Sequence, residues 1–282
     1  MGVPVRDGIK PLRADDLGAF LALTLRDPVL DVFAEYRARG TSLDARWLGA
    51  EMWGRFSDGG LVAACHVGAN LVPVGGSVDD AVAFAERAAG KERTVSTLVG
   101  RHEHVEAMWD VLRRSWDPPR DIRWRQPHLE IGSQPLVEPD PAVRLTVAED
   151  FGVLYPACVA MYTEEVGVSP EVAAGGEAYR ARVRQLMNRG WSFARIDDGR
   201  LVFKAEVACA TPYAAQIQGV YVAPEHRNQG HAAAGVAAVV EAVRASIAPR
   251  VSLYVNEWNA AARAAYARVG FVETARFSTI MF

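Results

Sequence analysis

Residues 220–232 read VYVAPEHRNQGHA and join a strand-like apolar run to a long Ala/Val-rich segment. Pro224 disfavours regular structure and predicts a turn. Gly230 has no Cβ, so the backbone here can approach a bound group closely. The first amides of the helix expected at about 230–247 lack intrahelical partners and carry the positive end of its dipole. This stretch therefore predicts an anion site suited to a pyrophosphate, with Arg227 as a fixed positive charge at its edge.

A second informative stretch is NAAARAAYARVGF at residues 259–271, which follows a strand-like run at 251–256. In a helix over about 259–268, Asn259 and Tyr266 are seven residues apart and lie on one face. The two side chains are therefore expected to point toward the same groove. Without the rest of this pattern, a tyrosine on an Ala-rich helix is equally consistent with an aromatic residue of the hydrophobic core.

The C-terminal half predicts an α/β (α+β) fold. The expected elements are helices at about 146–165 and 175–189, strands at 191–196, 201–209 and 214–222, the 230–247 helix, the 251–256 strand, the 259–268 helix and a final strand pair at the C-terminus. The strands on either side of the 230–247 helix should be parallel and adjacent, because a helical crossover joins them.

The N-terminal half predicts a similar order, with strands at 61–65 and 70–75, a helix at 78–89, a strand at 93–99 and a helix at 103–116. This order suggests a duplication, although no residue-level repeat is visible. A proline-containing stretch at 126–142 predicts the boundary. We therefore expect an N-terminal domain at 1–132 and a C-terminal domain at 143–282.

Composition narrows the class of protein. The chain has 282 residues, half of them hydrophobic, and a formal net charge of −3, which gives no reason to expect nucleic acid or an anionic membrane as a partner. Three scattered cysteines suggest neither a disulfide framework nor a metal site. No signal peptide or membrane-spanning stretch is apparent, so a cytoplasmic protein, monomeric or homodimeric, is expected.

The two stretches together carry a family resemblance. Arg227-x-x-Gly230-x-Ala232 is similar to the pyrophosphate loop R/Q-x-x-G-x-G/A of the GNAT acetyltransferases, and residues 259–271 match their N-x-x-A-x-x-L/A-Y-x-x-x-G-F helix. The resemblance covers about 143–282 and implies the GNAT fold, a mixed central sheet flanked by helices. The whole layout resembles tandem GNAT proteins of actinobacteria, with a smaller, degenerate GNAT-like N-terminal half.

The resemblance implies an N-acetyltransferase that uses acetyl-CoA and a primary amine in a ternary complex. It assigns the pantetheine arm to the strand Val220, Tyr221 and Val222, and the pyrophosphate to the amides of Arg227, Asn228, Gln229, Gly230, His231 and Ala232. Asn259 would hydrogen-bond the cosubstrate, and Tyr266 would protonate the departing thiolate. An amide near Val220 would polarise the thioester carbonyl.

The acceptor must attack as a neutral amine, so a base is useful. Several GNAT proteins carry a glutamate five residues before the helix asparagine, where this chain has Tyr254. The best substitute is Glu206, whose pKa would rise if it were buried; a solvated surface role is the alternative. Glu164 and Glu165 form a further acidic pair, either near the acceptor or simply on the surface.

Other interpretations stay open at this stage. A mycothiol-synthase-like acetylation of a cysteinyl sugar is one, and a non-catalytic acyl-CoA-binding regulatory module is another. In the N-terminal half, Asp79 and Asp80 would repel a pyrophosphate from the helix that they begin. The run at 113–125 mixes arginines with tryptophans, as nucleic-acid sites do, but its acids and prolines favour a surface connection or an interdomain contact.

Overall fold

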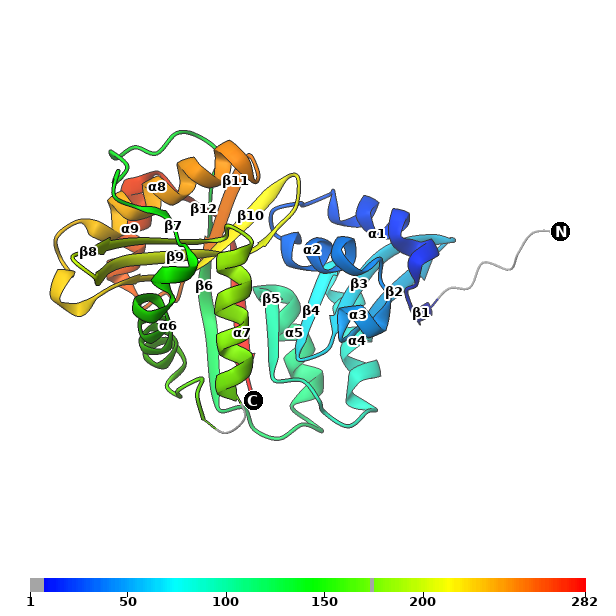
Figure 1. Cartoon of the computed structure of the whole chain (residues 1–282). Helices are drawn as coiled ribbons and strands as arrows, with labels where there is room; N and C mark the ends of the chain where they lie inside the picture. Colours follow the sequence, from blue (N-terminus) through cyan, green and yellow to red (C-terminus); the bar gives the residue numbers. More distant parts are fainter. Residues whose placement is uncertain (1–7, 173–174) are drawn as a thin grey trace. The chain divides into compact units, whose positions relative to one another are not determined.

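The computed structural model describes residues 8–172 and 175–282 (Figure 1). The contacts divide the chain into two compact units. Unit 1 contains the described residues up to His128 together with Tyr254–Trp258 and Glu273–Phe282, and unit 2 contains Leu129–Leu253 and Asn259–Val272. The first division, between residues 128 and 129, lies close to the expected boundary. The last strand, which was expected in the C-terminal domain, groups with unit 1.

Unit 1 is built on one sheet with the strand order β1-β2-β3-β4-β5-β12-β6. The strands are β1 (Gly8–Pro11), β2 (Glu51–Ser57), β3 (Gly60–Val67), β4 (Asn70–Gly75), β5 (Thr97–Arg101), β6 (Asp121–Ile131) and β12 (Val272–Met281). The pair β4–β5 is parallel, because α4 forms the crossover between them. The strand β12 pairs antiparallel with β5 from Phe277–Arg101 to Met281–Thr97, which explains why the chain end belongs to this unit.

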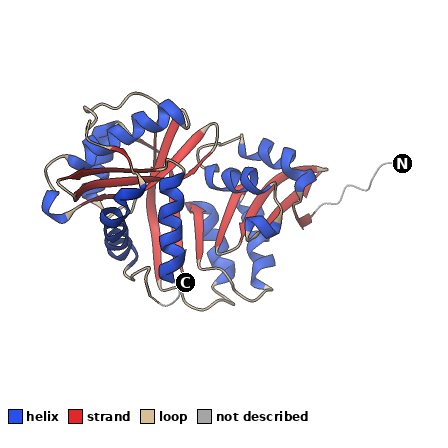
Figure 2. Ribbon diagram, in the orientation of Figure 1, coloured by secondary structure: helices blue, strands red, loops and turns tan. Residues whose placement is uncertain are grey.

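Helices pack on the unit 1 sheet and form its core (Figure 2). They are η1 (Ala14–Asp16), α1 (Leu17–Thr24), α2 (Val32–Thr41), α3 (Ala45–Leu48), α4 (Val78–Ala89) and α5 (His102–Leu112). The elements before residue 50 carry no clear periodicity and were not predicted. The stretch expected to be a surface connection is partly the strand β6, because its alternate residues Ile122 and Trp124 pack against the core.

The start of α4 is capped by side chains of its own first turn, so it is not an open anion site. Ser77 caps the helix by accepting from the Asp80 amide at 3.2 Å, and the Asp80 carboxylate accepts from the Ser77 amide at 2.8 Å. Asp80 also pairs with Arg55 at 2.8 Å. This reciprocal cap satisfies the Asp80 amide with the Ser77 hydroxyl, and places a carboxylate where an anion would otherwise approach the start of α4.

Unit 2 is built on the sheet β11-β10-β9-β8-β7. The strands are β7 (Arg144–Leu145), β8 (Ser192–Asp197), β9 (Arg200–Ala210), β10 (Ala214–Val222) and β11 (Arg250–Tyr254). The helices are η2 (Ala148–Asp150), α6 (Phe151–Val166), α7 (Gly175–Asn188), η3 (Pro224–His226), α8 (His231–Ser246) and α9 (Ala260–Val269). The parallel pairing of β10 and β11 across α8 confirms that prediction. The expected final strand pair is wrong, because residues 272–281 form the single strand β12.

Helices cover both faces of the unit 2 sheet. Phe203 and Lys204 are consecutive on β9, so their side chains point to opposite faces. A Cβ at Gly235 of α8 would lie 2.7 Å from the Phe203 ring, whereas Lys204 contacts Cys158 of α6. The helices α6 and α8 therefore lie on opposite faces. Among the described residues, no helix is both long enough and apolar enough to span a membrane.

Candidate functional site

The strands β10 and β11 pair only over their first residues. The parallel register runs from Ala214–Arg250 to Gln216–Ser252, while β10 continues to Val222 and β11 to Tyr254. The edge of β10 that faces β11 therefore carries backbone groups beyond Gln216 that this pairing does not use. The predicted strand contact, Val220 to Val222, lies in this part of β10.

The same part of β10 contains a bulge. Gln218 pairs with Glu206 and Tyr221 with Lys204, so two residues of β10 lie opposite one residue of β9. Gly219 has a φ of +61°, a conformation that L-residues rarely adopt. Such a bulge redirects backbone amides out of the ladder. It lies next to Val220, the position at which the resemblance expects an amide to polarise a carbonyl.

The strand β10 leads through η3 into the predicted anion loop. Asn228 has a φ of +62° and Gly230 a φ of +87°, and Gly230 is the N-cap of α8. No side chain caps this helix, so its first amides are open, unlike those of α4. A Cβ at Gly230 would meet nothing within 4 Å, so the glycine is needed for its backbone conformation and not for space within the protein. His231 and Ala232 form the first turn.

Arg227 lies at the edge of this loop, and its guanidinium already has partners. Its Nε donates to the Val222 carbonyl at 3.1 Å, and one Nη donates to both Glu164 oxygens at 3.0 and 2.9 Å. The guanidinium also lies 5.4 Å from the centre of the Tyr221 ring. Glu164 belongs to the end of α6, so the structure places this acid on the anion loop.

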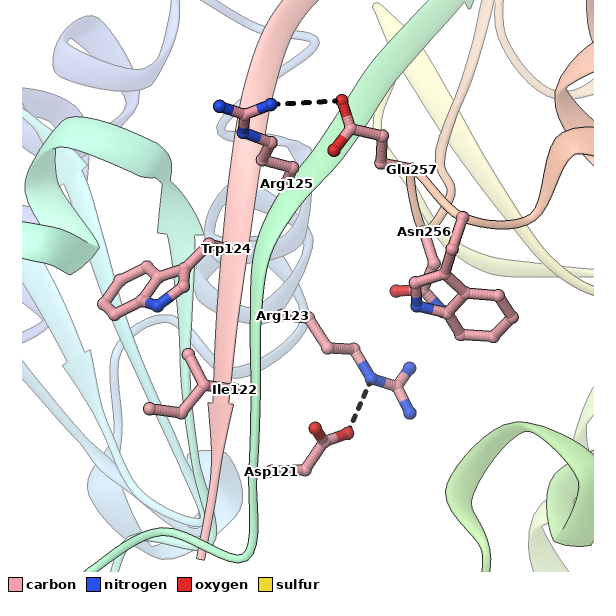
Figure 3. A pocket seen from close by; sticks show the side chains of 8 residues that line it. Asp121, Ile122, Arg123, Trp124, Arg125, Asn256 and Glu257 are labelled. Atoms are coloured by element: carbon pink, nitrogen blue, oxygen red, sulfur yellow. Dashed lines mark hydrogen bonds and ion pairs between the residues drawn. The ribbon is translucent and has the colours of Figure 1, made fainter.

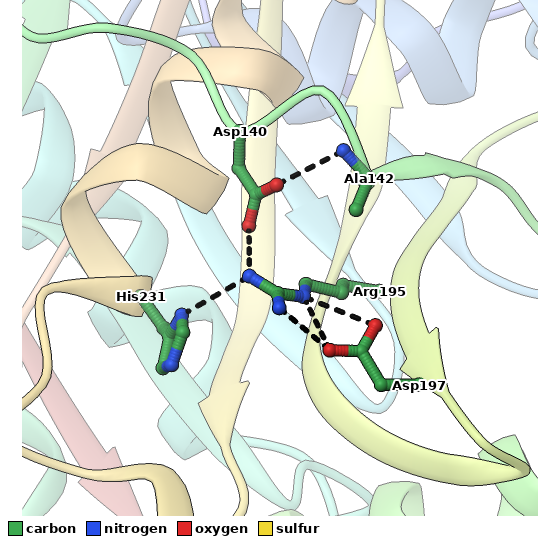
Figure 4. A network of polar contacts seen from close by, with 5 residues as sticks. All are labelled: Asp140, Ala142, Arg195, Asp197 and His231. Atoms are coloured by element: carbon green, nitrogen blue, oxygen red, sulfur yellow. Dashed lines mark hydrogen bonds and ion pairs between the residues drawn. The ribbon is translucent and has the colours of Figure 1, made fainter.

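A charged network that sequence reasoning missed supports the start of α8 (Figure 4). Arg195 of β8 donates to Asp140 at 3.0 Å and to Asp197 at 2.6 Å, and its Nη1 lies 3.4 Å from Nδ1 of His231. Hydrogen bonds from Arg195 to Asp197 and Asp140 raise the pKa of its guanidinium above the ordinary value. This guanidinium is neutralised by two acids and holds the loop residue His231 in place.

The helix α9 presents the second predicted motif. The Asn259 side chain accepts from the Ala262 amide at 3.1 Å and so caps α9, a role that the sequence reasoning did not assign to it. Tyr266 is 6% exposed, and its ring lies 5.9 Å from that of Phe271. Burial, and to a smaller extent the charge of Glu165, raises the pKa of Tyr266, so the hydroxyl keeps its proton at neutral pH.

Glu206 is buried, at 8% exposure, and is not the solvated surface residue of the alternative interpretation. Its Oε1 accepts from Gln218 Nε2 at 2.9 Å and its Oε2 from Lys204 Nζ at 3.2 Å. Both partners were missed, although Lys204 stands two residues away on the same strand face and was visible in the run FKAEVAC. Tyr254, at the position where relatives carry an acid, is partly exposed and lies against Phe277.

A separate pocket of about 500 Å³ lies within unit 1 (Figure 3). It is lined by Asp121 to Arg125 and Asn256 to Trp258, and contains none of the predicted site residues. Arg123 pairs with Asp121 at 3.0 Å and Arg125 with Glu257 at 3.6 Å. These pairs neutralise two arginines of the run whose composition resembled a nucleic-acid site. We therefore place the candidate site at the bulge and the anion loop and not in this pocket.

Two family models each match one part of the chain. Residues 178–271 match the acetyltransferase (GNAT) family, and residues 50–154 match a domain of unknown function, DUF4081. The first match contains the anion loop, the bulge and α9. No curated protein matched the sequence.

Solved structures are similar over nearly the whole chain. A GCN5-related N-acetyltransferase from Sphaerobacter thermophilus has a TM-score of 0.60 at 18% identity, with 99% of this chain and 96% of that chain covered. A GNAT-family acetyltransferase from Colwellia psychrerythraea has a TM-score of 0.59 at 15% identity, covering 98% and 99%. A tandem GNAT protein from the clavulanic acid biosynthesis pathway has a TM-score of 0.56 at 17% identity, covering 97% and 98%. At these identities the likeness concerns the fold.

Proposed function

Residues 178–271 form a GNAT acetyltransferase domain, and from this premise we propose that the protein transfers an acetyl group from acetyl-CoA to a primary amine by direct attack in a ternary complex. The observation that carries the proposal is the continuity of three features along one segment: the part of β10 beyond its β11 pairs, the bulge at Gly219, and the uncapped start of α8. An extended acyl-CoA has a matching order of groups, with pantetheine between thioester and pyrophosphate.

Each feature suits one part of this cosubstrate. The pyrophosphate would accept hydrogen bonds from amides between Asn228 and Ala232, at the positive end of α8. The Arg227 amide, which the sequence also assigned to this role, already donates to the Pro224 carbonyl at 3.3 Å. The pantetheine amides would pair with the backbone of Val220 and Val222, as an added strand does. The amide freed by the bulge would donate to the carbonyl oxygen of the thioester, on which negative charge develops. Asn259, already engaged as the α9 cap, would contact the cosubstrate through a remaining lone pair or its amide group.

The proton transfers fall to two buried side chains. As the amine nitrogen bonds to the carbonyl carbon, Glu206 would take a proton from that nitrogen, directly or through water. As the carbon–sulfur bond breaks, Tyr266 would donate its proton to the sulfur, giving an N-acetylated product and free CoA thiol. Because the pKa of Tyr266 is raised, its hydroxyl carries the proton that this step requires. The acidic end of α6, with Glu164 and Glu165, would attract a cationic acceptor.

The test is calorimetric titration with acetyl-CoA, followed by measurement of free thiol release on a panel of amines. We expect binding that is lost in Arg227→Glu, and thiol release with some amines. Arg200→Glu, an exposed arginine at the β8–β9 turn, is the matched control and should bind as wild type does. Absence of binding would refute the site, and binding without thiol release on any amine would favour a regulatory acyl-CoA-binding module.

A further inference from the structure

The most unusual residue in unit 2 is Lys204, whose side chain is entirely inaccessible to solvent. It is one of only three lysines in the chain, and the other two, Lys10 and Lys91, are at least half exposed. Burial of an unpaired ammonium group costs desolvation free energy. Even a buried ion pair often stabilises a protein less than apolar side chains of the same volume. Packing alone therefore gives no reason for a lysine at this position.

The partners of Lys204 keep it charged. Burial acts to lower the pKa of Lys204, but the Glu206 carboxylate and the Cys158 thiol raise it above the ordinary value. Nζ lies 3.2 Å from Oε2 of Glu206, and Cys158 of α6 contacts the same ammonium. Lys204 is therefore an ammonium at neutral pH, fixed between a strand and the helix that covers it.

The ion pair lies directly beneath the β10 bulge. In the register, Lys204 faces Tyr221 and Glu206 faces Gln218, so the bulged residues lie between these two positions. A Cβ at Gly219 would come within 3.0 Å of Nζ of Lys204 and 3.1 Å of the Glu206 carboxyl carbon. No side chain fits between the bulged backbone and the pair. Glu206 is thus hydrogen-bonded to Lys204 and Gln218, next to the bulge at Gly219. The Tyr179 hydroxyl of α7 and the Cys158 thiol of α6 also lie close enough for the charge of Glu206 to raise the pKa of each.

We infer that Lys204 is a positioning residue, which fixes the Glu206 carboxylate beneath the bulged backbone of β10 and supplies the positive charge that faces it. The inference rests on the proposed acetyl transfer, in which Glu206 takes the proton of the amine. A base must be ionised to accept a proton, and burial alone disfavours the ionised carboxylate. An ammonium at 3.2 Å offsets that burial, while a carboxylate with four lone pairs keeps capacity for one further proton donor.

The test compares Lys204→Met, which keeps the volume and removes the charge, with Lys10→Met as the matched control. We expect Lys204→Met to bind acetyl-CoA as wild type does, and to move the acidic limb of the kcat/KM–pH profile up by about 1 to 3 pH units. The rate at neutral pH falls by ~10-fold or more. An unchanged acidic limb would overturn the inference. Lys204→Gln, whose amide still donates a hydrogen bond without charge, serves if Lys204→Met does not fold.

A second readout separates this inference from the proposed function. In protein labelled with ¹³C at glutamate side-chain carboxyls, the Glu206 signal is identified by its absence in Glu206→Gln. The signal should show protonation at a higher pH in the Lys204 variant than in wild type, whether or not any amine is acetylated. Equal titration in both proteins would refute the role of Lys204. If the Glu206 signal titrates at a higher pH in the Lys204 variant but no amine releases thiol from the wild type, the acetyl transfer is refuted and the role of Lys204 is not.

Discussion

Tyr266 and Gly219 are the two single residues on which the proposed chemistry depends most directly. The first supplies a protonated hydroxyl on a buried helix face, and the second supplies a backbone conformation with positive φ that L-residues rarely adopt. Tyr266 is buried, and Gly219 lies against the Lys204–Glu206 pair. Each role can therefore be tested by removing one small group.

Replacing Tyr266 by Phe removes the hydroxyl and keeps the ring beside Phe271. We expect kcat to fall by about 10²- to 10⁴-fold, the usual contribution of a general acid, with little change in the Kd for acetyl-CoA. Stopped-flow thiol release and calorimetry measure the two quantities. Tyr213→Phe, at a partly exposed tyrosine after β9, is the control. An unchanged kcat in Tyr266→Phe would mean that another group, or water, protonates the thiolate.

Gly219→Ala can be compared with Gly199→Ala, because both glycines have positive φ. Gly199 has a φ of +72° and open space around its Cβ position, whereas a Cβ at Gly219 meets Lys204 and Glu206. The Gly199 variant should lose about 1 to 2 kcal/mol of unfolding free energy from backbone strain. The Gly219 variant should lose more, and only it should slow thiol release. If both variants lose the same unfolding free energy in urea denaturation and release thiol at the same rate, the bulge does not act on the ion pair.

At the scale of elements, the end of α6 and the anion loop are joined by the ion pair between Glu164 and Arg227. The pair is roughly half exposed on both sides, so it contributes little to stability. A phosphate group would compete with the carboxylate for the same guanidinium. Binding of the cosubstrate is therefore expected to loosen the link between α6 and the loop.

Glu164→Gln is expected to lower the Kd for acetyl-CoA by up to ~5-fold. The reason is that the exposed ion pair which it removes contributes at most about 1 kcal/mol. Calorimetry at two salt concentrations measures this change, which should shrink as salt screens the pair. Glu177→Gln, on the exposed face of α7, is the control. Weaker binding in Glu164→Gln would show that the carboxylate instead supports the loop in the bound state.

In unit 1, the buried carboxyl of Asp31, the N-cap residue of α2, is expected to make the free energy of unfolding depend on pH. Burial, only partly offset by Arg101, raises the pKa of Asp31 to about 7. A carboxyl group whose pKa is higher in the folded than in the unfolded state stabilises the fold below about pH 4, and this contribution is lost as the pH rises through about 7. Urea midpoints of wild type should therefore fall more steeply between pH 4 and 7 than those of Asp31→Asn. The exposed Asp15→Asn variant should follow wild type, and parallel curves for Asp31→Asn would contradict the assignment.

At the scale of the whole molecule, the chain leaves unit 1 after His128, returns to it briefly at Tyr254–Trp258, and completes it with its last strand. Residues 273–282 fill the sheet between β5 and β6, and Ile280 within them is fully buried in the unit 1 core. Deleting residues 273–282 is expected to unfold unit 1, because it exposes two inner strand edges and removes core side chains. Circular dichroism and limited proteolysis should show this loss. A truncated chain that unfolds as cooperatively as the full chain would contradict the expectation.

Much of unit 2 and of the candidate site could be predicted from the sequence, because the signals are local. Strand β10, the turn at Pro224, the glycine before α8 and the capped helix α9 each lie within a few consecutive residues, and their order follows from the chain direction. The parallel pairing of β10 and β11 followed from the single helix between them. Asp79 and Asp80 likewise indicated that the corresponding helix start in unit 1 is not an open anion site.

Only the tertiary structure decided what each charge faces. Asp140 meets Arg195, Glu164 meets Arg227, and β12 pairs with β5 although some 170 residues separate them. Such contacts leave no periodic signal, because they depend on which surfaces come together when the core forms. The Lys204–Glu206 pair is the clearest case. Two residues on one strand face are visible in the sequence, but their burial beneath a bulge is fixed by α6 and β10. The sequence by itself determined the order of elements in unit 2 and the glycine-containing loop before α8, and packing determined the burial and the partners of the groups proposed to move protons.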